Sequence, residues 1–198
     1  KNKQQLVYNI VVYGHDTDGY IEIAEKFFNG NGYVYNGKLS AWRMPGIAFV
    51  YGPIYYFFGR EVASVSFVII QFLLSVFSVY YVAKIAYILS SKTSVFYITY
   101  ILYLISTYVS IYDHFLLTES MSASIVVFSL YHFLLYFKHL KIINLVFSAL
   151  LLSLGIMFRP AVSFIAIAYI LFYIYYIYRM NIFDFMMVKK LLVFCAIT

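Results

Sequence analysis

Long uninterrupted runs of apolar residues dominate the chain from residue 62 onward, and short polar connections separate them. Five runs have 17 to 22 residues and a sixth begins near the end of the sequence: Val62–Ala83, Val95–Tyr112, Thr118–Phe137, Ile142–Phe158, Ala161–Tyr178 and Leu191–Thr198. About 20 apolar residues in a helix span a bilayer, and a helix satisfies its own backbone in lipid. The runs lack the alternation of barrel strands. They predict an all-α, polytopic membrane bundle over residues 62–198, with about five complete spans and the start of a sixth.

Residues 1–61 have a different pattern, with frequent turns and polar positions. Eight of the nine glycines and five of the eight acidic residues fall in this part. Asp16 or Thr17 is placed to cap a helix that runs to about Asn29, where an Asn-Gly-Asn-Gly sequence stops it. A second apolar stretch, residues 47–58, is too short to span a bilayer, which is typical of a segment at the interface. We therefore expect a long first extracytoplasmic loop that carries interfacial helices.

The two ends of the sequence indicate a fragment of a longer membrane protein. The chain begins at Lys1 without the pattern of a signal peptide. It ends at Thr198, inside an apolar run. We expect a transmembrane helix before the first residue and further sequence after the last.

Basic residues alternate between connections and so indicate the orientation of the helices. The first, third and fifth connections carry two or three Lys or Arg each, whereas the second has none and the fourth has only Arg159. By the positive-inside rule, the odd connections face the cytoplasm. The long loop, the turn around Asp113 and the Arg159-Pro160 turn then share the outer face. The sequence predicts an integral membrane protein whose polar loop and turns face outward.

Composition agrees with this assignment. Of the 198 residues, 64% are hydrophobic and only 11% are charged, whereas a soluble domain carries about 25% charged residues. The net charge of +6 reflects scarce acids rather than abundant bases, which argues against a nucleic-acid partner. A single cysteine excludes an intrachain disulfide framework. Few residues are therefore left to carry chemistry on the outer face.

The first candidates for that chemistry lie in the long loop. Asp16 and Asp18 are the candidate catalytic acids, and Tyr20 lies one helical turn after Asp16, on the same face. Arg43 stands just before the interfacial stretch, where its guanidinium can bind a lipid phosphate through two hydrogen bonds. Each residue also has a simpler structural interpretation, because a carboxylate caps helices and an arginine anchors a chain at the membrane surface.

Two further candidates for substrate binding follow the later outer turns. Thr118 can cap a helix whose first turn holds Glu119, and an ionisable side chain at the membrane boundary commonly faces a cavity or a partner. Arg159 is the only cation of its turn, so it is either an interface anchor or an anion-binding group. Asp113, His114 and Glu119 share one turn, and a divalent metal site there is a further hypothesis.

These candidates belong to motifs that follow one another in a characteristic order. The motifs are Asp16-x-x-x-Tyr20-x-x-x-Ala24, Gly30-Asn31-Gly32-Tyr33, Arg43-x-Pro45-Gly46, Phe57-Phe58-Gly59, Thr118-Glu119 and Gly155-x-x-x-Arg159-Pro160. The series resembles the GT-C superfamily of integral-membrane glycosyltransferases. More narrowly it is similar to protein O-mannosyltransferases, aminoarabinose transferases and rhizobial lipopolysaccharide-core glycosyltransferases. The resemblance covers essentially the whole chain.

The resemblance implies transfer of a sugar from a polyprenyl-phosphate donor to a lipid, glycan or protein acceptor at the outer membrane surface. It also implies a bacterial or archaeal cell membrane and an active site that faces outward. It places the essential acid of the family at Asp16, as a general base or as the group that orients the acceptor hydroxyl. Arg43 and Arg159 would stabilise the leaving lipid phosphate. Glu119 would position substrate or help hold a divalent metal ion. The second acid of the family stands one residue later than usual here, at Asp18, which leaves its role open.

Other classes of membrane protein remain as alternatives. A lipid-linked glycan flippase or transporter needs polar groups near mid-membrane, where the runs Val62–Ala83 and Val95–Tyr112 carry no charge. A polysaccharide polymerase is expected to have arginine-rich outer loops. A non-catalytic membrane scaffold would tolerate a neutral residue in place of Asp16.

Overall fold

A computed structural model describes residues 11–13, 16–40, 43–106, 111–180 and 185–198. Helices hold 82% of these residues, which confirms the predicted helical class. Two short strands, β1 (Val34–Tyr35) and β2 (Lys38–Leu39), form an antiparallel hairpin. The helices are α2 (Thr17–Phe28), α3 (Gly46–Phe58), α4 (Arg60–Ser90), α5 (Thr93–Leu104), α7 (Glu119–His139), α8 (Ile142–Phe158), α9 (Ser163–Met180) and α10 (Phe185–Ile197), with short 3₁₀ helices η1 (Ile111–His114) and η2 (Pro160–Val162).

Three helical segments are long and apolar enough to cross a membrane, by length and composition. They are Arg60–Ser90, Glu119–His139 and the joined η2 and α9, Pro160–Met180. Helix α8 is apolar and has the predicted bounds, but its 17 residues make it shorter than these three. The described residues thus support three of the five predicted spans by length.

The second apolar run is shorter as a helix than predicted. Helix α5 ends at Leu104 after 12 residues, and the last two residues of the run belong to the separate 3₁₀ helix η1. None of the α5 side chains is buried, and a short helix with little buried surface is only marginally stable. Residues 107–110 of the predicted run lie outside the described residues.

Two helices extend past charged residues that the sequence pattern treats as boundaries. Helix α4 continues through Lys84 to Ser90, and its 31 residues make it about 46 Å long at about 1.5 Å per residue. The Lys84 ammonium lies over the rings of Tyr80 and Phe96, so its charge is accommodated on the helix surface. Helix α10 begins at Phe185, before the basic pair that precedes the sixth predicted run.

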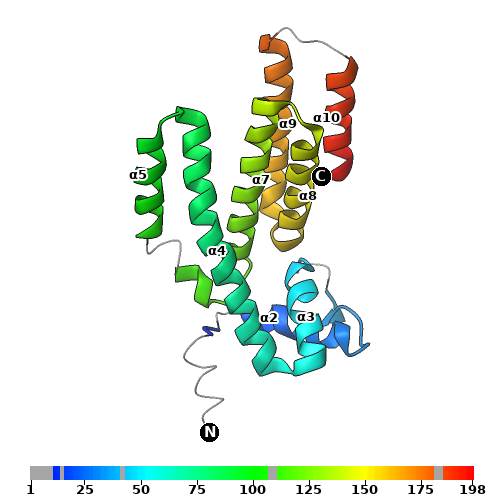
Figure 1. Cartoon of the computed structure of the whole chain (residues 1–198). Coiled ribbons are helices and arrows are strands. Elements are labelled where there is room, and N and C mark those ends of the chain that lie inside the picture. The colour runs from blue at the N-terminus through cyan, green and yellow to red at the C-terminus, as the bar shows by residue number, and fades with distance from the viewer. Residues whose placement is uncertain (1–10, 14–15, 41–42, 107–110, 181–184) are drawn as a thin grey trace.

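The helices are arranged so that the connections separate to two ends of the molecule (Figure 1). Helices α2 and α3 lie at one end, together with the beginning of α4, the turn before α7 and the turn after α8. The connections α4–α5 and α7–α8 lie toward the other end, as do the end of α9 and the beginning of α10. The structure therefore gathers the described part of the long loop and the two turns that are predicted to face outward at one end, as the alternation of basic residues predicts.

Two apolar cores hold this arrangement. The first joins α2 and α3 to α4 and the turn before α7, and includes Ile21, Ile47, Tyr51, Phe67, Leu116 and Phe158. The second lies among α7, α8, α9 and α10, and includes Phe133, Tyr136, Leu152, Tyr173 and Phe194. An ion pair adds to the first, because Glu25 accepts hydrogen bonds from Arg60 Nε at 2.7 Å and Nη2 at 2.6 Å. The first core fixes α2 and α3 on the end of the longer helices.

Candidate functional site

Asp16 occupies the N-cap position of α2, but its side chain makes no capping hydrogen bond. Its Oδ1 instead accepts a hydrogen bond from Arg43 Nη2 at 2.5 Å. The Asp16 side chain is 63% exposed, whereas that of Arg43 is 15% exposed. Asp16 therefore presents a carboxylate at the surface that its less exposed partner Arg43 holds in place. Asp18, also exposed, lies in the first turn of the same helix.

Two tyrosines, Tyr20 and Tyr33, also contact Arg43. The guanidinium lies over the Tyr20 ring, 4.5 Å from its centroid, and the Tyr33 hydroxyl donates a hydrogen bond to the Arg43 carbonyl at 2.9 Å. Burial lowers the pKa of Arg43, but the hydrogen bonds with Asp16 and Tyr20 outweigh it, so the pKa is raised. Arg43 thus forms one cluster with Asp16 and Tyr20, the two residues that the sequence placed on the same face.

Glu119 and Arg159 form a second acid–arginine pair. Arg159 Nη1 lies 3.1 Å from Glu119 Oε1, and the two side chains are 47% and 33% exposed. Thr118 makes no side-chain cap for α7, and its hydroxyl donates instead to Glu119 Oε2 at 3.5 Å. The pair joins the beginning of α7 to the turn that follows α8, so packing brings together two residues that the sequence placed in separate outer turns.

The turn before α7 does not gather a metal site among the described residues. Asp113 is 2% exposed and accepts a hydrogen bond from Ser120, while Glu119 is engaged with Arg159. No group of three or more His, Cys, Asp or Glu side chains in the described part of the chain could hold a metal ion. The described residues therefore provide no ligand set for the divalent metal site that the sequence suggested at Asp113, His114 and Glu119.

Two contacts place the two clusters on adjoining segments. Thr17, next to Asp16, is buried and donates a hydrogen bond to the Leu116 carbonyl at 3.3 Å, shortly before Glu119. Gly46, shortly after Arg43, packs so closely on the end of α8 that an added Cβ would lie 2.7 Å from the Met157 carbonyl. The loop that carries Asp16 and Arg43 is therefore fixed against both segments that carry the second pair.

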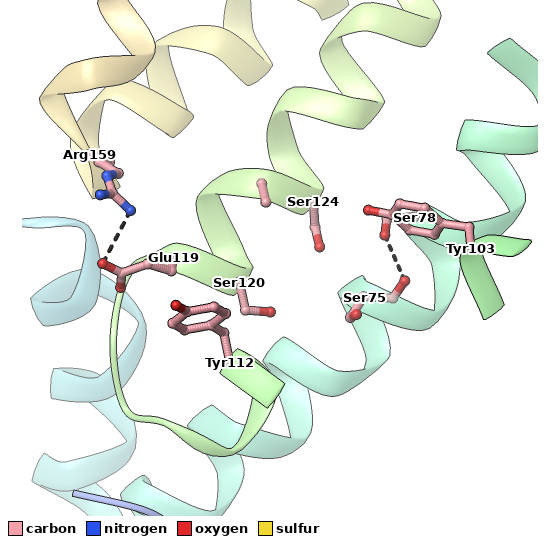
Figure 2. A pocket seen from close by; sticks show the side chains of 9 residues that line it. Ser75, Ser78, Tyr103, Tyr112, Glu119, Ser120, Ser124 and Arg159 are labelled. Carbon is pink, nitrogen blue, oxygen red and sulfur yellow. Dashed lines mark hydrogen bonds and ion pairs between the residues drawn. The ribbon is translucent and has the colours of Figure 1, made fainter. Parts of the chain in front are cut away.

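A cavity of about 480 Å³ opens beside the second pair, between α4, α5, η1 and α7 (Figure 2). Its lining is rich in hydroxyl groups and consists of Ser75, Ser78, Tyr103, Tyr112, Glu119, Ser120, Ala123, Ser124 and Arg159. Of the predicted site residues, Glu119 and Arg159 line this cavity, whereas Asp16, Asp18, Tyr20 and Arg43 do not. A single catalytic centre predicts that Asp16, Glu119 and Arg159 converge on one cavity, and this expectation is not met: the structure brings the predicted residues together as two adjacent groups, and Asp16 lies outside the cavity lining.

The buried polar face of α4 has no counterpart in the sequence-based site. It consists of Ser64, Gln71, Ser75 and Ser78, all nearly inaccessible. Their spacings of seven, four and three residues place them on one side of a helix, so helical periodicity within the apolar run is the signal that could have identified them. The run is uncharged, as predicted, but one of its faces is polar.

Gln71 attaches this face to the turn before α7. Its side-chain amide donates hydrogen bonds to the carbonyls of Asp113, at 3.2 Å, and Phe115, at 2.9 Å. The opposite edge of the same turn pairs with Val12, whose N–H donates to the His114 carbonyl at 2.8 Å. The backbone that leads into Glu119 is therefore held from both sides.

Comparisons of the chain with protein-family models, with curated proteins and with solved structures give no match. The described residues define a helical protein in which three helices are long and apolar enough to cross a membrane, and two acid–arginine pairs lie on adjoining segments. Function is therefore assigned below from the residues and their geometry.

Proposed function

We propose that this chain belongs to a polytopic integral-membrane glycosyltransferase that moves a sugar from a polyprenyl-phosphate donor to a lipid, glycan or protein acceptor on the outer face of the membrane. One observation carries the proposal: two acid–arginine pairs, Asp16–Arg43 and Glu119–Arg159, lie on adjoining segments at one end of an apolar helical molecule. Such a reaction needs a carboxylate beside the acceptor hydroxyl and a cation beside the leaving phosphate.

The exposed surface supports a membrane location. Large apolar side chains are exposed on α3, α4, α8 and α9, and they include Phe57, Phe72, Phe77, Leu150 and Leu171. Exposed apolar surface of this extent is rare in soluble monomers, whereas it is expected where helices face lipid. Aromatic residues at the end of α3 suit an interfacial helix. The basic connections at the far end favour a cytoplasmic location for that end.

In the proposed reaction, the Asp16 carboxylate accepts the proton of the acceptor hydroxyl. The acceptor oxygen attacks the anomeric carbon, and the bond between that carbon and the phosphate oxygen breaks. Polyprenyl phosphate leaves with the bonding electron pair, and Arg159 stabilises its added charge. Arg43 and Tyr20 orient Asp16, and Glu119 orients Arg159. Asp18 is exposed in the first turn of α2, two residues after Asp16, and no step of the reaction is assigned to it.

A lipid-linked glycan flippase is the second candidate, because the buried polar face of α4 offers hydroxyl groups within a long apolar helix. That face ends at Ser78, however, and the buried residues beyond it on α4 are Val79 and Ala83. A pathway that crosses the membrane would need polar groups in that half as well. This observation favours a site open to one end over a continuous path.

The test uses the natural gene product in proteoliposomes, with and without the substitution Asp16→Asn. We expect the variant to insert normally and to lose sugar transfer, because an amide cannot take the acceptor proton. Glu22→Gln is the matched control, since Glu22 is another carboxylate on α2 and pairs with Lys26. Transfer at the wild-type rate by Asp16→Asn would reject Asp16 as the base. Translocation of lipid-linked sugar without transfer would favour the flippase.

A further inference from the structure

We infer that the cavity beside Glu119 and Arg159 accepts the sugar ring of the donor and selects an uncharged sugar over an acidic or amino sugar. The inference rests on the proposed function and refines it, because it names the class of sugar that is transferred. It draws on the hydroxyl groups, the rings and the charges that line the cavity.

Four serines supply hydrogen-bonding groups from two packed helices (Figure 2). Ser75 and Ser78 lie three residues apart on α4, and Ser120 and Ser124 lie four residues apart on α7. These spacings place each pair on one face of its helix, and both faces border the cavity. A hydroxyl donates one hydrogen bond and accepts two, so this lining is complementary to the hydroxyl groups of a sugar.

The protein already uses part of this hydrogen-bonding capacity. Ser78 donates to the Ser75 carbonyl at 2.7 Å, and Ser120 donates to the Asp113 carboxylate. Because their protons are committed, these two hydroxyls offer acceptor lone pairs to a ligand. A ligand that donates several hydrogen bonds, as a sugar does, fits such a surface.

Another serine of α7, Ser129, joins two helices instead of lining the cavity. Ser129 donates to the Ser148 carbonyl at 2.9 Å, and their hydroxyl oxygens lie 3.1 Å apart, between α7 and α8. Small hydroxyl residues commonly join membrane helices in this way. Ser124 lies on the same helix but borders the cavity, which suits ligand binding better than helix packing.

Two tyrosines complete the walls. Tyr103 comes from α5 and Tyr112 from η1, and in Figure 2 the Tyr112 ring lies close to Glu119 and Ser120. A tyrosine ring offers an apolar face and its hydroxyl a polar end. A sugar has the matching surfaces, because its C–H groups form apolar patches between its hydroxyl groups.

The charges of the lining explain the selection against charged sugars. Glu119 and Arg159 are the ionisable acid and base of the described lining, and their charges compensate one another. Because Glu119 and the donor phosphate would both engage Arg159, a sugar carboxylate would lie near Glu119 and near Asp113 behind Ser120 without a cation of its own. A sugar ammonium would compete with Arg159 for Glu119. In both cases a charge loses water without gaining a free partner, which is costly.

The experiment measures binding to the natural gene product in nanodiscs. The probes are four short-chain prenyl phosphates: one without sugar, and one each with a neutral hexose, a hexuronic acid and an amino sugar. We expect the neutral donor to bind about tenfold more tightly than either charged donor. Ser124→Ala should weaken the neutral donor about threefold or more and leave the sugar-free probe unchanged. Ser129→Ala is the matched control, and it should preserve the preference.

The outcomes separate this inference from the function on which it rests. Equal or tighter binding of an acidic or amino sugar, or an unchanged affinity of Ser124→Ala for the neutral donor, would overturn the inference and leave the glycosyltransferase proposal standing. If none of the four probes bound, including the sugar-free prenyl phosphate, both the inference and the glycosyltransferase proposal would be contradicted. A thermal unfolding curve for each variant identifies a loss of binding that comes from misfolding.

Discussion

Arg159 lies 3.1 Å from Glu119 and thereby joins the turn after α8 to the first turn of α7. Both side chains are partly exposed, and an ion pair in such a position contributes about 0–1 kcal/mol to stability. The pair also borders the hydroxyl-lined cavity. We therefore expect its loss to affect the proposed reaction far more than the stability of the fold.

The first prediction concerns the signs of these two charges. Glu119→Arg and Arg159→Glu, made singly, should each reduce sugar transfer at least about a hundredfold. Glu119→Arg removes the carboxylate that orients Arg159, and Arg159→Glu places a carboxylate beside the leaving phosphate. The double variant restores an ion pair with reversed positions. It should recover normal thermal stability but not transfer, since the phosphate would meet a carboxylate. Transfer rates in proteoliposomes and unfolding temperatures in detergent measure the two effects. Recovery of both in the double variant would show that the pair acts only as a link between helices.

Hydropathy predicts the helices well where charged or turn-forming residues border an apolar run. Helix α8 has the predicted bounds because Lys141 precedes it and Arg159-Pro160 follows it. The pattern predicts α5 less well, because the length of a helix also depends on packing, and no α5 side chain is buried. Hydropathy reports which residues avoid water and not how much surface each helix buries.

The few charged residues of the sequence identify most of the candidate site, but they do not predict which acid pairs with which arginine. Asp16 and Arg43 belong to different segments, and only tertiary packing brings them to 2.5 Å. Ser75 and Ser78 escape notice because uncharged residues in an apolar run barely change its hydropathy. Their contribution becomes visible once α4 and α7 pack together and leave a cavity between them and α5.

The second prediction concerns the close approach of α3 to α8. A Cβ at Gly46 would lie 2.7 Å from the Met157 carbonyl and 2.8 Å from the Phe158 ring. Because a backbone atom is involved, Gly46→Ala should push α3 away from α8 and displace Arg43 relative to Arg159. We expect a loss of about 1–3 kcal/mol in stability and a clear loss of transfer. Thermal unfolding and the transfer assay give the two values.

Gly37→Ala separates this steric effect from the general cost of replacing a glycine. Gly37 has a φ of +76°, and nothing lies within 4 Å of the position of an added Cβ. Its replacement should cost about 1 kcal/mol through backbone strain while transfer stays near the wild-type rate. Equal effects of the two substitutions on transfer would contradict a specific role for the contact between α3 and α8.

The third prediction concerns Gln71, which is fully buried and donates hydrogen bonds to the carbonyls of Asp113 and Phe115. Gln71→Met keeps a similar volume but removes both donors, so two carbonyls lose their partner. We expect a loss of about 1–3 kcal/mol in stability, measured by thermal unfolding in detergent. Gln71→Glu should cost more, because an ionised carboxylate would face two carbonyl oxygens without a donor between them.

Ser78→Ala provides the comparison for Gln71→Met. Ser78 lies on the same buried face of α4, but its hydroxyl bonds to a carbonyl of its own helix, that of Ser75. Its removal leaves the turn before α7 in place, so stability should change by less than about 1 kcal/mol. Loss of Gln71 releases the backbone that leads into Glu119, and transfer should fall together with stability. If Gln71→Met and Ser78→Ala unfolded at the same temperature, the hydrogen bonds from Gln71 would not be what holds this turn.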